Sequence, residues 1–180
     1  MLNRVKLNLE AVEAMLYYWQ AASEKDNISE QFFYDVAEMP GLKAAYDEEF
    51  NGESVRRALS AIKNREIFDG NKKEKRFWNN NMWMMEDLEF TYAMAAPLKV
   101  LNLDDILEEV KTFDNKNNYE EVEVIFSPLH TDEYIISENK LIINFFKIKI
   151  NLDGTSDEVT INDLSLKDYI KSKLKELLNK

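Results

Sequence analysis

The spacing of hydrophobic residues changes once along the chain and divides it into two parts. Up to about residue 112, apolar side chains recur every three or four positions, which is typical of amphipathic helices. Over residues 119–180, apolar and charged residues alternate in several short stretches, which is typical of half-buried strands. The polar segment 114–118 separates the two periods. The pattern therefore predicts a helical part followed by a sheet.

Local signals place the beginnings of the helices in the first part. Asn8 and Ser29 precede apolar-periodic stretches and are suitable N-caps, because their side chains accept hydrogen bonds from free backbone N–H groups. Asn71 with Glu74 three residues later fits a capping box. We expect a helix to begin there and to run up to Pro97, which would stop or kink it.

The second part contains four stretches with strand character, at 122–126, 133–136, 141–150 and 158–161. The third has apolar residues on both faces, so it is either central in the sheet or an exposed edge that needs a partner. A final helix is expected from Ser165, where an apolar face is formed by Leu166, Tyr169, Ile170, Leu174 and Leu177.

These elements predict an α+β fold in which a helical N-terminal part, about residues 1–112, precedes a small antiparallel β-sheet and a C-terminal helix. We expect a single domain over 1–180, with a helical subdomain at 1–112 and the sheet with its terminal helix at 119–180. Hydrophobic residues make up 45% of the chain and aromatic residues 12%, which is enough for a packed core.

The composition excludes several classes of protein. The net charge of −11 is spread along the chain and repels phosphate backbones and anionic lipids, so neither a nucleic-acid nor a membrane partner is expected. The chain has no cysteine and hence no disulfide or thiolate metal site. No apolar run approaches about 18 residues. We expect a soluble, cytoplasmic protein, monomeric or homodimeric, without a cofactor.

Candidates for catalytic chemistry are few. His130, the only histidine, lies in a loop beside Asp132 and could act as a general base, although a lone loop histidine is more often simply solvated. The stretch 153–158 is rich in carboxylates but does not match a calcium-binding loop, and Asp-Gly is first of all a turn signal. No catalytic residue and no metal ligand is predicted.

A second group of carboxylates lies at Glu86, Asp87 and Glu89. Paired carboxylates can perform acid–base chemistry or hold a metal. On a helix, however, these three positions spread over more than a quarter of the circumference, and no Glu-x-x-His motif accompanies them. A solvated or ion-paired face is the favoured interpretation.

The most unusual stretch is "RFWNNNMWMMEDLEF" at 76–90. Two adjacent apolar stripes predict a central helix that packs on two or more neighbours. The alternative is a ligand-lining cluster, because tryptophan and methionine also line pockets. The two interpretations are compatible, and the residues predicted to line a pocket are Trp78, Asn81, Met82, Trp83 and Met85.

The order of the segments "LNLEAVEAMLYYW", "FFYDVAEMPGLKAAY" and "VEVIFSPLHTDEYIISENKLIINFF" resembles the part of bacterial zinc-dependent peptidases, of uncharacterised families, that precedes their metal site. The resemblance implies that the helix after the sheet would carry H-E-x-x-H, with two histidines as zinc ligands and a glutamate as base. Here that helix reads "LSLKDYIKSKLKELLNK" and contains no histidine. The resemblance therefore implies a peptidase-like scaffold without this activity.

Three functions remain open at this point. The favoured hypothesis is a non-catalytic binding or interaction module that holds a small molecule, a protein or a peptide between the helices and the sheet. The second is a metal-dependent enzyme that works through carboxylates. The third is an oligomeric regulatory component.

Overall fold

The computed structural model describes residues 1–151 and 159–180. The first half contains β1 (Arg4–Asn8), α1 (Glu10–Ser23), α2 (Glu30–Ala37), α3 (Pro40–Lys43), α4 (Gly52–Asn64), α5 (Lys72–Glu86) and α6 (Leu88–Lys99). The second half contains the 3-10 turn η1 (Asp104–Ile106), α7 (Leu107–Val110), β2 (Glu121–Ser127), β3 (Tyr134–Ser137), β4 (Lys140–Asn144), the 3-10 turn η2 (Phe145–Lys147), β5 (Thr160–Ile161), β6 (Leu164–Ser165) and α8 (Leu166–Leu178).

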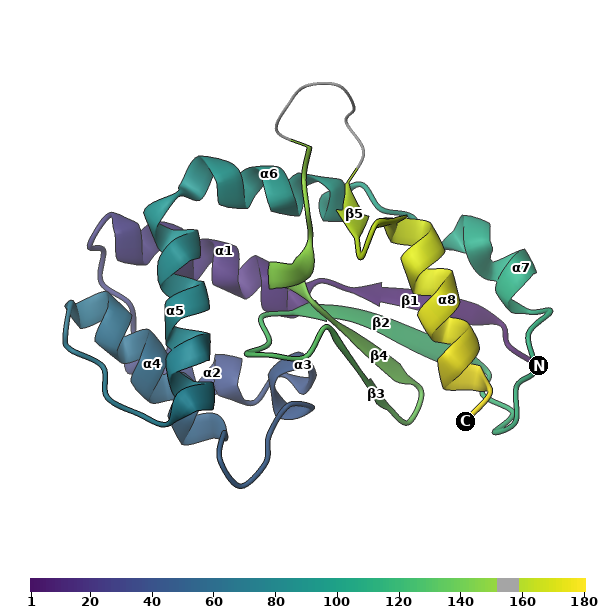
Figure 1. The fold of residues 1–180 in the computed structure, drawn as a ribbon, viewed down its shortest axis with the longest axis horizontal. Helices are drawn as coiled ribbons and strands as arrows, with labels where there is room; N and C mark the ends of the chain where they lie inside the picture. Colours follow the sequence, from purple (N-terminus) through teal and green to yellow (C-terminus); the bar gives the residue numbers. More distant parts are fainter. Residues whose placement is uncertain (152–158) are drawn as a thin grey trace.

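The main sheet has the strand order β1-β2-β4-β3. β1, β2 and β4 run parallel, and β3 is antiparallel to β4. Helices α1 and α8 contact the sheet, while α2, α4 and α5 pack together at one end of the molecule (Figure 1). β5 and β6 form a separate antiparallel pair beside the start of α8. The structure is therefore an α+β fold with a C-terminal helix, as the sequence predicts.

The core lies between the helices and one face of the sheet. Alternate residues of the strands point to this face, because successive side chains of a strand lie on opposite sides. Val122, Val124 and Phe126 of β2 are fully buried here, together with Trp19 of α1 and Tyr169 of α8. Burial of such large side chains stabilises the fold by about 1.5–3 kcal/mol each.

The opposite face of the sheet is covered at one point by α3. Ile125 and Ile142 are buried there against the chain that follows α3. Gly41 makes this contact possible, because a Cβ atom at that position would lie 2.8 Å from both Cβ and Oγ of Ser127. Only glycine lets the backbone of α3 approach the strand so closely.

The N-terminal strand corrects the prediction that residues 1–112 are helical and that the sheet is antiparallel. Residues Arg4–Asn8 form β1 and pair with Glu121–Ile125 in parallel register. Val5 and Leu7 face the core while Arg4 and Lys6 face solvent, so an alternating pattern was present. It covers only five residues, and β1 pairs with a strand far along the chain. The connection from β1 to β2 contains α1 to α7, which is long enough for the crossover that a parallel pair requires.

A second correction concerns the helix expected to run from Asn71 to Pro97. It consists of two helices, α5 and α6, that meet at Asp87. The carboxylate of Asp87 caps α6 by accepting a hydrogen bond from the Phe90 N–H, and its backbone is not helical. The Thr91 hydroxyl lies 2.8 Å from the Met84 carbonyl oxygen near the end of α5. Pro97 lies within the last turn of α6 and does not end it.

A third correction concerns the long strand expected at 141–150. β4 ends at Asn144, whose side-chain oxygen accepts a hydrogen bond from the Phe146 N–H and starts the turn η2. Polar side chains that bond to nearby backbone compete with strand pairing in this way. β4 is central, between β2 and β3, so it is not the exposed edge that the sequence left open.

Several local predictions are confirmed. Ser29 caps α2, and Asn71 with Glu74 forms a capping box at the start of α5. Ser165 caps α8 by accepting a hydrogen bond from the Asp168 N–H. The apolar face predicted for this last helix is buried. Across residues 1–151 and 159–180, no helix is long and apolar enough to cross a membrane.

Candidate functional site

A groove of about 470 Å³ lies between α2, α4 and the segment 66–69. Residues three and four apart on each helix face the same side and form its walls. The lining from α2 is Glu30, Phe33 and Tyr34, and that from α4 is Arg56, Arg57, Ser60 and Ala61. The segment 66–69 closes the remaining side. The volume of the groove lies in the range of sites that hold small molecules or parts of peptides.

One wall of the groove is formed by Arg56 and Tyr34. The guanidinium carbon of Arg56 lies 4.4 Å from the centre of the Tyr34 ring, which is a cation–π distance. Within the described residues, the guanidinium has no hydrogen bond or ion pair. The N–H groups of Arg56 are therefore available to a hydrogen-bond acceptor of a ligand. The Tyr34 ring restricts the orientation of the guanidinium plane.

The wall formed by Arg57 and Phe68 is held more tightly. Arg57 lies over the Phe68 ring, with 5.4 Å between guanidinium carbon and ring centre. Its guanidinium also donates hydrogen bonds to the Glu74 carboxylate at 3.1 Å and to the Asp69 carbonyl oxygen at 2.6 Å. Since Glu74 neutralises Arg57, the two arginines differ: Arg57 supports the wall, and Arg56 is open to a ligand.

The closing segment is anchored at its start by Arg65. This residue has a left-handed backbone with φ of 56° and ends α4. Its side chain donates to the carbonyl oxygens of Ile62 and Ala22, at the ends of α4 and α1. The next apolar residue, Ile67, is 99% exposed at the lip of the groove. This fully exposed isoleucine, two residues after the anchored Arg65, makes the lip a surface on which a partner can bury apolar area.

The charge of the groove is mixed. Glu30, Glu66 and Asp69 line the rim, and all three are exposed. They oppose the field of the arginines, and the whole chain is acidic as well. A ligand with many negative charges is therefore disfavoured, whereas a single acceptor group can still bind the directed donors of Arg56.

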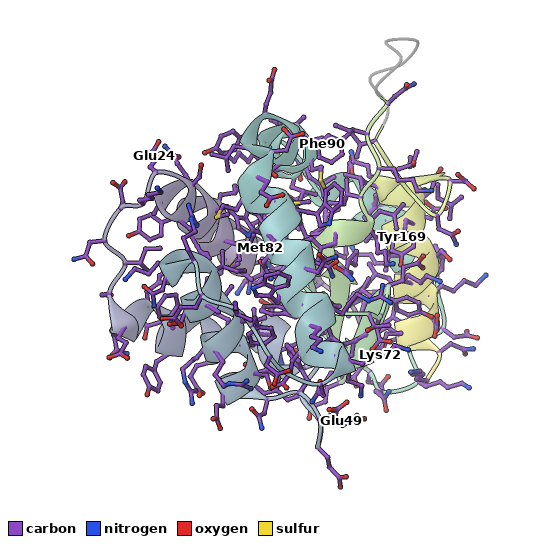
Figure 2. The ribbon with its side chains drawn as sticks, turned by 60° about the vertical axis from the view of Figure 1, so that its left-hand side comes forward. Glu24, Glu49, Lys72, Met82, Phe90 and Tyr169 are labelled. Carbon is purple, nitrogen blue, oxygen red and sulfur yellow. The ribbon has the colours of Figure 1, made fainter. Side chains whose placement is uncertain are left out.

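The five residues predicted to line a pocket lie on α5 but do not line this groove. Asn81 and Met85 are buried, Trp78 and Met82 are partly buried, and Trp83 is 65% exposed. Figure 2 shows α5 coming forward with Met82 near its middle. The helix packs against α1, α4 and α6, as predicted for a central helix.

Two of these five residues have clear structural roles. The side-chain oxygen of Asn81 accepts a hydrogen bond from the Trp19 indole N–H at 3.0 Å, and its amide donates to the Phe77 carbonyl oxygen at 2.9 Å. Trp78 stacks on Phe68, with 6.1 Å between ring centres and 10° between planes. Trp78 thus reaches the groove through Phe68, which it supports from behind.

His130 is buried, contrary to the expectation of a solvated loop residue. It is 6% exposed, and its ring centre lies 4.4 Å from that of Phe50. Nδ1 is buried and has no hydrogen-bond partner in the described structure. Burial lowers the pKa of His130, and the nearby Asp132 opposes this shift. The loop is held against β4 because Asn144 donates to the Asp132 carbonyl oxygen and accepts from the Leu129 N–H.

The lowered pKa predicts a loss of stability at mildly acidic pH. The unfolded chain takes up a proton near pH 6.5, whereas the folded chain resists it, so the free energy of unfolding should fall as pH decreases below 6.5. Because His130 is the only histidine, His130→Phe should remove this slope down to about pH 5, where carboxylates begin to titrate. Urea unfolding at several pH values measures the effect. An unchanged slope in His130→Phe would contradict it.

The carboxylates considered for metal chemistry do not come together. Asp87 caps α6, and Glu86 and Glu89 are exposed. The stretch 153–158 lies outside the described residues. Among the residues that the structure describes, no group of three or more histidine, cysteine, aspartate or glutamate side chains could hold a metal ion.

A polar network joins β3 to α8. Tyr169 donates to the Glu133 carboxylate at 3.0 Å and Tyr134 to the Glu176 carboxylate at 2.7 Å. Lys173 lies over both tyrosine rings. Burial and the bond to Glu133 raise the pKa of Tyr169, which keeps the hydroxyl protonated as a donor. These bonds explain how α8 is fixed on the sheet.

Comparisons with known proteins give no further indication. No protein-family model, no curated protein and no solved structure matches this chain. The fold and the groove are therefore the basis for assigning a function.

Proposed function

We propose that this protein is a non-catalytic binding module whose ligand lies in the groove between α2 and α4. The observation that carries the proposal is the open guanidinium of Arg56, stacked on a partly exposed tyrosine in a groove of about 470 Å³. Arginine and tyrosine are enriched among the residues that dominate binding energies. The groove lies among helices, whereas the sequence favoured a site between helices and sheet.

The lining supports binding better than catalysis. A nucleophile needs a base within hydrogen-bond reach. Ser60, the serine in the lining, accepts a hydrogen bond from the Asn64 amide, which cannot act as a base. The described helix after the sheet, α8, carries no histidine and presents Leu166, Ile170 and Leu174 to the core. A peptidase-like scaffold used for binding stays part of this proposal.

The test is a fragment screen by two-dimensional NMR on the ¹⁵N-labelled chain. Fragments that bind should shift the amide signals of residues in α2, α4 and 66–69. Ser60→Trp should abolish these shifts, because the indole would fill the groove from a partly exposed position. Asn79→Trp places the same side chain on an exposed position of α5 outside the groove and serves as the matched control.

The outcomes separate clearly. Shifts that are lost in Ser60→Trp and kept in Asn79→Trp support the groove as the binding site. Fragments that bind Ser60→Trp as well as the unmodified chain, or that shift signals elsewhere, would contradict it.

A further inference from the structure

The groove differs from a closed small-molecule pocket in what surrounds it. Ile67 is 99% exposed and Tyr34 is 49% exposed, and both line the groove. A ligand that fits entirely within the groove volume of about 470 Å³ would leave much of the surface of Ile67 and Tyr34 exposed to solvent. Only a ligand that continues beyond the groove covers them. The exposed surfaces of Tyr34 and Ile67 therefore favour a segment of another protein over a small molecule as the ligand.

The charges restrict the chemistry of that chain. Arg56 offers uncompensated N–H donors, whereas Arg57 is already bound by Glu74. The rim carries Glu30, Glu66 and Asp69, so a polyanion such as a nucleic acid is repelled. One carboxylate that reaches Arg56 gains charge-assisted hydrogen bonds without bringing a second negative charge near the rim.

The remaining lining is apolar and aromatic. Phe33 and Ala61 are buried beneath the groove, and Phe68 is held flat against Trp78. An aliphatic or aromatic side chain next to the carboxylate would lie on these residues. Phe68 is fixed from behind by stacking and by Arg57, so little ordering is needed on binding.

We propose that the groove recognises a segment of a partner protein that carries one acidic side chain flanked by apolar side chains. The carboxylate binds Arg56, and an apolar neighbour packs between Phe33 and Phe68. Tyr34 and Ile67 cover the parts of the segment that leave the groove. This proposal rests on the proposed function, because it names the ligand of the same groove.

The test uses two pools of nine-residue peptides with blocked ends. In the first, the central residue is Asp or Glu and its neighbours are Leu or Phe. In the second, Asn or Gln replaces the acid. Affinity selection with mass spectrometry, followed by NMR titration of the selected peptides, should show about tenfold tighter binding from the acidic pool, because a charge-assisted bond replaces a neutral one.

Variants assign this preference to one side chain. Arg56→Gln should make the two pools bind equally and lower the thermal midpoint of unfolding only slightly, because the guanidinium makes no described hydrogen bond or ion pair and loses only its cation–π contact with Tyr34. Arg76→Gln changes an exposed arginine of α5 outside the groove and should keep the full preference. Raising the salt concentration should reduce the preference.

Each result has a defined meaning. Equal binding of both pools at the groove would overturn acid recognition and leave the binding module intact. If neither pool shifts the groove signals while fragments do, the partner is not a peptide segment and the present proposal fails. If neither fragments nor peptides reach the groove, the proposed function itself fails.

Discussion

Asn81→Leu is expected to lower the free energy of unfolding by about 2–4 kcal/mol. Asn81 is fully buried and joins α5 to α1 through the Trp19 indole N–H. Leucine has a similar size but offers no acceptor, so the indole N–H would remain buried and unpaired. The bond from Asn81 to the Phe77 carbonyl oxygen would be lost as well. Urea unfolding followed by tryptophan fluorescence measures the change.

Two further variants make this prediction specific. Asn79→Leu, the same substitution on the exposed side of α5, should change the stability by less than about 0.5 kcal/mol. Combining Asn81→Leu with Trp19→Phe removes donor and acceptor together, so the double variant should lose less stability than the sum of the single variants, by about 1 kcal/mol. Strict additivity would show that the Trp19–Asn81 bond is not the cause.

Gly41→Ala is expected to destabilise the fold by about 1–3 kcal/mol, because the added methyl group overpacks a close contact. The new Cβ would lie 2.8 Å from both Cβ and Oγ of Ser127 and 3.1 Å from Cγ2 of Ile125. These atoms belong to β2 in the middle of the sheet, so α3 would have to move. Thermal and urea unfolding measure the loss.

A rescue variant tests this cause directly. Ser127→Gly removes both nearest atoms, so the double variant should be more stable than the sum of the single effects predicts. Gly52→Ala is the matched control. There the nearest atom is the flexible end of Arg56 at 3.3 Å, and alanine suits the first turn of α4. A loss in Gly52→Ala as large as that in Gly41→Ala would argue against the steric explanation.

The sequence predicts best the elements whose ends carry their own signals. The caps at Ser29, Asn71 and Ser165 depend on side chains within three residues, so they can be identified locally. The errors at β1 and Asp87 have a different origin. The pairing of β1 is set by a strand far along the chain, and Asp87 sits in an apolar-periodic stretch that favours one long helix.

The groove could be predicted only in part. The predicted cluster on α5 does contain Trp78, which supports Phe68, but the groove itself arises from the packing of α2 against α4. The spacing of apolar residues along the sequence predicts each helix but does not show that these two pack against each other. One signal was available: Ile67 and Phe68 are large apolar residues in a short polar loop next to Asp69 and Gly70. Such residues in a loop often serve an interaction rather than the core.

The parallel pairing of β1 with β2 also governs how the chain must fold. The N-terminal strand cannot find its partner until the chain beyond residue 121 has been synthesised. Its apolar residues Val5 and Leu7 therefore stay without their sheet neighbours while α1 to α7 leave the ribosome. Contacts between segments this far apart in the sequence raise the contact order, which slows folding relative to a fold built from local contacts. Until β2 is available, the unpaired edge of this strand makes the nascent chain prone to aggregation.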